Sequence, residues 1–207
     1  MPKVKLLLVL VGVLAALPQG AFGQTEKGNI EWGILFGKEF FASDSRADDD
    51  FVFGARIGYG FWKNFEIEVI SDKTTTTART VSLIEIEVKS LTGNVIWNFW
   101  TSPREQAGAY VSGGVGTIDA TVDVPANVFT PFSILPTTGW AGNLPVAAAG
   151  SQDDSDTLFT LAAGIRAFVS EKVAFRYEIR LKSYEVFNVS TKQLEFTFSF
   201  SVFHRRK

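Results

Sequence analysis

The chain has 207 residues, a formal net charge of −2, one histidine and no cysteine. The absence of cysteine excludes disulfides, zinc–thiolate sites and cysteine nucleophiles. The weakly acidic charge excludes the basic surface that nucleic-acid binding requires. The length suits a single domain.

The start of the chain has the three parts of a secretory signal peptide. Two lysines lead into an apolar run over residues 6–17, and small residues precede a cleavage site after Gly23. The apolar run is too short to span a bilayer as a helix, which takes about 20 residues. We therefore expect residues 1–23 to be a cleaved signal peptide, and residues 24–207 to form one mature domain that begins at Gln24.

Apolar and polar residues then alternate with a period of two, which is typical of β-strands whose two faces meet different surroundings. No later stretch has the length of a transmembrane helix, so any crossing of a membrane must use strands. The alternating segments and the turn residues between them predict eight strands, in chain order at residues 29–41, 51–63, 65–73, 82–100, 107–119, 156–170, 173–185 and 193–203.

The fourth segment contains a change in the facing of its apolar residues. Ile84, Ile86 and Val88 have the opposite parity to Val95 and Trp97. Either a β-bulge between the two halves or a strand that rises beyond a membrane explains such a change. The sequence leaves both explanations open.

The seventh segment shows the alternation most clearly. Phe175, Tyr177 and Ile179 fall on one face of the expected strand, whereas Arg176 and Glu178 fall on the other. A helix would scatter both sets around its circumference. The segment is therefore a strand with one apolar face and one charged face.

The connections between the predicted strands alternate in length. Short turns join the second strand to the third, the fourth to the fifth and the sixth to the seventh, whereas longer polar stretches join the others, the longest over residues 120–155. Outer-membrane barrels have this asymmetry, with short periplasmic turns and long external loops. The predicted fold class is all-β, as an eight-stranded antiparallel transmembrane up-and-down β-barrel.

The aromatic residues indicate that the apolar faces point outward, toward lipid. The interior of an eight-stranded barrel is just wide enough for its own side chains, and rings from every strand would overfill it. The charged faces then point inward, where charges must be paired because an unpaired buried charge is costly. We expect an interior ion-pair network that plugs the barrel, in preference to a charged pore lining, made by Arg56, Glu66, Glu68, Arg166, Arg176, Glu178, Arg180, Lys182 and Glu195.

Three segments resemble the OmpA-like family of eight-stranded outer-membrane barrels, in its outer-membrane protein β-barrel domain branch. They are the Phe-rich end Leu194–Phe203, the Gly-rich Tyr110–Gly116, and Phe175–Arg180. The resemblance implies a barrel in the outer membrane of a Gram-negative bacterium, inserted by the outer-membrane assembly machinery and in contact with outer-membrane lipid and lipopolysaccharide. The chain departs from the family where a basic tail, residues 204–207, follows the C-terminal aromatic residue.

The sequence indicates neither catalysis nor a cofactor. Because the single histidine, His204, lies in the basic tail, a serine triad lacks a base and a zinc site lacks a ligand set. The acidic clusters at residues 48–50 and 153–156 lack the regular spacing of a calcium loop. They are expected to keep external loops solvated, with calcium binding as the alternative. We therefore expect no enzyme activity, no cofactor and no metal site.

The longest connection contains the best candidate for a contact surface. Apolar side chains in an external loop suggest contact with a protein, a lipid or the barrel mouth, and the candidates are Phe129, Phe132, Leu135 and Trp140. Two functions follow. The first is a structural or surface-interaction role, with any binding through the long external loops. The second is a narrow small-solute channel, or a binder of a small apolar ligand at the barrel mouth.

Overall fold

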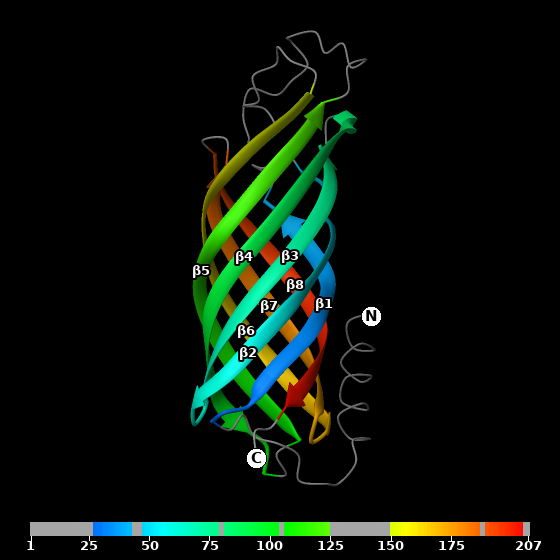
Figure 1. The fold of residues 1–207 in the computed structure, drawn as a ribbon. Coiled ribbons are helices and arrows are strands. Elements are labelled where there is room, and N and C mark those ends of the chain that lie inside the picture. The colour runs from blue at the N-terminus through cyan, green and yellow to red at the C-terminus, as the bar shows by residue number, and fades with distance from the viewer. Residues whose placement is uncertain are drawn as a thin grey trace.

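The computed structural model of the chain describes residues 27–42, 47–78, 81–103, 106–124, 150–186 and 189–204. Within them, eight antiparallel strands form a closed barrel in which each strand pairs with its neighbours in the sequence and β1 pairs with β8 (Figure 1). The strands are β1 (Ile30–Phe41), β2 (Asp50–Trp62), β3 (Phe65–Ala78), β4 (Val81–Thr101), β5 (Ala107–Val124), β6 (Gly150–Ser170), β7 (Val173–Val186) and β8 (Val189–His204). The predicted eight-stranded all-β barrel is confirmed. In the described part of the chain, no helix is long and apolar enough to cross a membrane.

The two ends of the barrel differ in their connections. At one end, called here the turn end, short turns join β2 to β3 and β6 to β7, and β8 finishes (Figure 1). Asn64 closes the first of these turns with a left-handed backbone, at a φ of 68°, which asparagine tolerates better than most residues. At the opposite end, called here the loop end, β4, β5 and β6 reach farthest along the barrel axis (Figure 1).

Several strands are longer than the sequence predicted, and two of the predicted long connections are short. β3 ends at Ala78 and β4 begins at Val81, while β7 ends at Val186 and β8 begins at Val189, so these connections cover only residues 79–80 and 187–188. The expectation of longer stretches at these two places was wrong.

β5 and β6 are also longer than the sequence predicted. β5 continues to Val124 and β6 begins at Gly150, so the connection between them covers residues 125–149 and not 120–155. The acidic segment 153–156, predicted to be an external loop, pairs with β5 as part of β6. The predicted boundaries fell short because aspartate and serine are typical of turns, whereas here they lie on a strand paired with β5.

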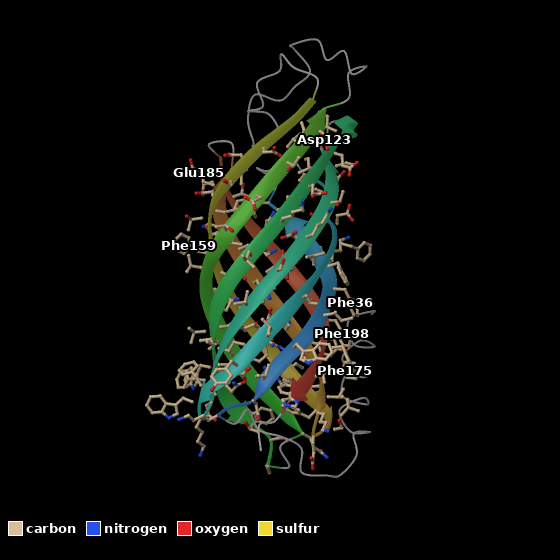
Figure 2. All side chains as sticks on the ribbon, viewed as in Figure 1. Phe36, Asp123, Phe159, Phe175, Glu185 and Phe198 are labelled. Carbon is tan, nitrogen blue, oxygen red and sulfur yellow. The ribbon has the colours of Figure 1, made fainter. Side chains whose placement is uncertain are left out.

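In the half of the barrel nearer the turn end, apolar side chains point outward and charged ones point inward. Tyr177 is exposed to the surroundings of the barrel, while its neighbour Arg176 is fully buried. Phe36, Phe175 and Phe198 project from the outer wall (Figure 2), and the rings of Phe175 and Phe198 stack 5.3 Å apart. This facing is the one that a barrel surrounded by lipid requires.

Nearer the loop end the two faces exchange their chemistry, so that apolar side chains lie inside the barrel and charged side chains lie outside. On β4, Ile86 and Val88 are buried inside the barrel, whereas Glu85 and Lys89 are exposed. The pairing of β4 with β3 and β5 runs from Glu85 to Trp97 without a register shift, which excludes a bulge at the change of facing. β4 and β6 have 21 residues each, about twice what a transmembrane strand needs. The point at which apolar residues move from the outer face to the inner face therefore marks where the strands leave the lipid.

The interior is filled in layers along the barrel axis. Phe168, Ala174 and Phe203 form a small apolar cluster at the turn end. Buried charged side chains occupy the middle of the interior, together with a small apolar cluster of Leu35, Val52 and Ile70. Toward the loop end the interior is filled by a larger apolar cluster, called here the apolar collar, which consists of Phe41, Ala47, Ala78, Ile84, Ile86, Val88, Ile118, Ala120, Val122, Leu158, Tyr184 and Val186.

Candidate functional site: an ionic interior

All nine charged residues that the alternation assigns to the interior point into the barrel, and each is at most 3% exposed. Contacts within hydrogen-bonding or ion-pair distance connect them to three further carboxylates. The interior ion-pair network is made up of Glu31, Glu39, Arg56, Glu66, Glu68, Asp72, Arg166, Arg176, Glu178, Arg180, Lys182 and Glu195.

Arg176 lies at the centre of this network. Its Nη1 donates to Glu68 at 2.6 Å and to Glu31 at 3.2 Å, and its Nη2 donates to Glu178 at 3.3 Å. Its Nε donates to the Tyr110 hydroxyl at 3.2 Å, and the guanidinium lies 4.7 Å from the centroid of the tyrosine ring. A planar guanidinium with five donors suits such a site. One side chain of β7 thereby links β1, β3 and β5.

Arg166 extends the network toward the turn end. Its guanidinium donates to Glu66 at 2.9 Å and to Glu31 at 2.8 Å. It also lies 5.5 Å from the centroid of the Phe203 ring, which belongs to the apolar cluster at that end. Asn98 of β4 donates to the same glutamate, Glu66, at 2.8 Å. The charged layer is thus joined directly to the apolar layer below it.

Lys182 extends the network toward the loop end. Its Nζ lies 3.1 Å from Glu39, 2.9 Å from Asp72 and 2.7 Å from Glu195. Arg180, two residues earlier on β7, pairs with Glu178 and lies 3.2 Å from Glu195. Three carboxylates from β1, β3 and β8 therefore share one ammonium group.

Four residues of the interior were not predicted from the sequence. Glu31 and Glu39 alternate with outward-facing residues such as Trp32, and Asp72 continues the inward parity of β3, so the period-two rule could have found all three. Tyr110 lies in a Gly-rich segment in which apolar and polar residues do not alternate, and its inward facing had no signal in the sequence.

Tyr110 is held in place by both charge and shape. Its hydroxyl donates to Glu178 at 2.7 Å, and Arg176 and Arg166 lie over its ring, the latter with its guanidinium 5.7 Å from the centroid. Directly across the β5–β6 pair stands Gly164. A Cβ added to this glycine would overlap the far end of the Tyr110 ring and would lie 2.7 Å from the backbone oxygen of Tyr177. The missing side chain is what makes room for the tyrosine.

Gly164→Ala is therefore expected to destabilise the barrel by about 1–3 kcal/mol, the usual cost of overpacking a filled interior. The tyrosine cannot move aside without losing its bonds to Glu178 and Arg176. Gly113→Ala on β5 is the matched control, because a Cβ there meets only one carbonyl oxygen, at 3.9 Å. Both variants reduce the flexibility of the unfolded chain similarly. Equal unfolding free energies for the two, measured in urea, would refute the steric explanation.

A smaller charged cluster lies on the outer surface, beyond the apolar part of the wall. Glu87 is 2.5 Å from both Lys73 and Lys89. Hydrogen bonds from Lys73 and Lys89 lower the pKa of Glu87, and the bond to this carboxylate raises the pKa of Lys89. Exposed pairs of this kind contribute little to stability. Their significance is positional, since they show where the outer wall of β3 and β4 meets water.

The remaining predicted sites fall on residues that the structure does not describe. Phe129, Phe132, Leu135 and Trp140, and the expected signal peptide at residues 1–23, lie outside the described residues. Among the residues that are described, no group of three or more acidic or histidine side chains is arranged to hold a metal ion.

The geometry agrees with comparisons to known proteins. A sequence profile described as the outer membrane protein β-barrel domain matches residues 6–201. The chain is similar to Neisserial surface protein A at a TM-score of 0.59 and 12% identity, over 84% of this chain and 95% of that one. It is also similar to Ail, the attachment invasion locus protein of Yersinia pestis, at a TM-score of 0.52 and 12% identity, over 86% and 99% of the two chains. No curated protein matches the sequence.

Proposed function

The chain belongs to the outer membrane protein β-barrel domain family, and we propose that it is a sealed scaffold that holds interaction loops above the outer membrane. Membership of the family places the barrel in the outer membrane of Gram-negative bacteria. The observation that carries the proposal is the layered interior, in which apolar clusters fill both ends and the interior ion-pair network fills the space between them. Export with cleavage after Gly23 is part of the same proposal.

The interior contacts support a structural role over conduction. Arg176 and Lys182 reach from β7 to carboxylates of β1 and β3 at distances of 2.6 to 3.1 Å. An ion passing through would have to separate such pairs, and breaking a buried pair costs about 3–5 kcal/mol. Eight strands also leave no wide lumen.

The long strands support a role at the cell surface. Because outer-membrane barrels have short periplasmic turns and longer external loops, the loop end is the extracellular end. Glu85, Asp123 and Asp153 are exposed on the outer faces of β4, β5 and β6, and Figure 2 shows Asp123 and Glu185 well above the outward-facing Phe36. The apolar collar fills this extension from within. The barrel thereby carries its external connections away from the bilayer.

The proposed contact surface is the connection at residues 125–149, with Phe129, Phe132, Leu135 and Trp140 as its apolar contact residues. Apolar side chains on an external loop are typical of binding surfaces. The other proposed partners are outer-membrane lipid and lipopolysaccharide around the wall, and the assembly machinery during insertion. The proposal assigns no chemical reaction and no cofactor to the barrel.

The apolar collar favours a second candidate function, the binding of a small apolar ligand at the barrel mouth. The inner wall there is apolar, and the hydroxyl of Tyr184 is buried in it without a hydrogen-bond partner among the described residues. A ligand with an apolar body and one polar group would match that wall. The narrow small-solute channel has less support, because both apolar layers would have to open.

Planar-bilayer recording of the refolded chain tests the sealed scaffold. We expect no conductance steps above those of the bare bilayer, with a wide-pore outer-membrane barrel as the positive control. Heat modifiability on a denaturing gel verifies that the inserted protein is folded. Reproducible, ion-selective steps from the folded wild-type chain would refute the sealed interior and favour the channel.

A further inference from the structure

The interior contains more acids than bases. Among the described residues, seven carboxyl groups and five cationic groups are buried in the interior ion-pair network. Two carboxyl groups therefore have no cation of their own. A buried carboxyl group without a compensating charge commonly takes up a proton and becomes neutral.

The imbalance is most pronounced at Glu39 of β1. The strand register places Glu39 directly opposite Glu195 of β8 on one side and directly opposite Asp50 of β2 on the other. Glu39 is thus the middle member of a row of three carboxyl groups. The row crosses the seam at which the first and last strands close the barrel. Like charges directly opposite each other destabilise a β-ladder.

Nearby cations compensate the neighbours of Glu39 better than Glu39 itself. Lys182 is 3.1 Å from Glu39, but it is closer to Asp72, at 2.9 Å, and to Glu195, at 2.7 Å. Arg180 lies 3.5 Å from Asp72 and 3.2 Å from Glu195. Of the ion pairs among the described residues, Glu39 takes part in one, whereas Asp72 and Glu195 each take part in two.

The remaining neighbours of Glu39 are compatible with a neutral acid. The Thr74 hydroxyl of β3 lies 2.6 Å from Glu39 Oε2. A hydroxyl can donate to a carboxylate and can equally accept from a carboxylic acid, so this bond persists when the acid is protonated. Tyr184 of β7 lies on the inward face of that strand, two residues beyond Lys182. The titratable groups around Glu39 are then three carboxyl groups, two cations and a neutral tyrosine: Asp50, Asp72, Glu195, Lys182, Arg180 and Tyr184.

We propose that Glu39 is a proton-binding site of the folded barrel and remains a neutral carboxylic acid at pH 7. Its proton removes the repulsion between Glu39 and its two cross-strand neighbours, Glu195 and Asp50. Lys182 and Arg180 are then left to compensate Asp72 and Glu195. Ionisation of Glu39 at higher pH would place three negative charges side by side on the closing seam, so that barrel closure is linked to pH.

The direction of this linkage follows from proton counting. In the unfolded chain a glutamate loses its proton near pH 4.3, approximately its ordinary pKa. Between that pH and the pH at which folded Glu39 ionises, the folded state holds one proton more than the unfolded state. The contribution of Glu39 to the folding equilibrium constant therefore falls as the pH rises, by up to about tenfold per pH unit.

Infrared spectroscopy of the full chain, refolded in phospholipid vesicles, detects the proton directly. We expect the carbonyl stretch of a protonated carboxylic acid at pH 7 in the wild type. The band should lose intensity in Glu39→Gln and keep its full intensity in Glu85→Gln, which alters an exposed glutamate of β4. Urea unfolding of the same proteins between about pH 5 and about pH 9 measures how stability depends on pH. The fall in stability that ionisation of Glu39 causes should be absent in Glu39→Gln and present in the wild type and in Glu85→Gln.

Several results would overturn the proposal. A folded wild type without the carboxylic band at pH 7 means that Glu39 is ionised. A band of unchanged intensity in Glu39→Gln places the proton on another residue, and a loss of intensity in Glu195→Gln alone assigns it to β8. Because glutamine has the shape and the neutrality of the protonated acid, failure of Glu39→Gln to fold would also contradict a neutral Glu39.

Discussion

Replacing Arg176 by alanine is expected to lower the free energy of unfolding by about 3–5 kcal/mol, because buried carboxylates lose their central cation. Arg176 is completely buried, and Glu31, Glu68 and Glu178 all lie within 3.3 Å of its guanidinium. Urea unfolding of the barrel in phospholipid vesicles, followed by tryptophan fluorescence, measures the loss.

Two further variants show what Arg176 contributes. Arg176→Lys retains the charge without the planar fork of donors, and we expect it to recover part of the loss. Lys192→Ala removes a cation from the exposed outer face of β8 and should change the stability by no more than about 0.5 kcal/mol. Unchanged stability of Arg176→Ala together with altered conductance would contradict the plug and favour a pore.

The second large effect is expected on the outer wall, where Val95→Arg should cost about 2–4 kcal/mol if Val95 faces the middle of the bilayer. Val95 is 50% exposed and stands midway along the outward apolar residues of β4, between Leu91 and Phe99. An arginine at this position must be solvated by lipid or must distort the bilayer around it. Unfolding in vesicles by urea gives the cost.

Glu85→Arg is the matched control for Val95→Arg. It introduces the same side chain on the same face of the same strand, ten residues closer to the loop end. Glu85 is exposed and is paired in the strand register with Asp123, so an arginine there meets an opposite charge in water. We expect a change within about 0.5 kcal/mol. Equal costs for Val95→Arg and Glu85→Arg would mean that both positions have the same surroundings, and would refute the proposed exit from the lipid.

Much of the barrel could be predicted from the sequence, because alternation reports local facing. The charged run from Arg176 to Lys182 lies on one face of one strand, and so its inward facing followed once the apolar face was assigned to lipid. Glu66 and Glu68 followed in the same way. The strand order also followed, since consecutive strands are neighbours in an up-and-down antiparallel barrel.

The partners within the network could not be predicted. Lys182 and Asp72 are separated by 110 positions in the chain, and their contact depends on the width of the barrel and the register of every pair of strands between them. Alternation also does not tell which face of a strand meets water. The opposite parity of Ile86 therefore had no single explanation until the structure showed that β4 continues beyond the lipid. Tyr110 has glycines nearby on both faces, and no pattern identified its side.

β4 keeps its register with both neighbouring strands from the part in lipid to the part beyond it, so the barrel can change in length without a change of pairing. Adding two residues to each strand of a hairpin near the loop end lengthens the pair by about 7 Å and keeps every later side chain on its own face. Adding one residue to each would turn outward the apolar-collar residues that lie beyond the insertion on those two strands. The length of the barrel beyond the lipid can therefore be changed in steps of residue pairs, with no adjustment of the part in lipid.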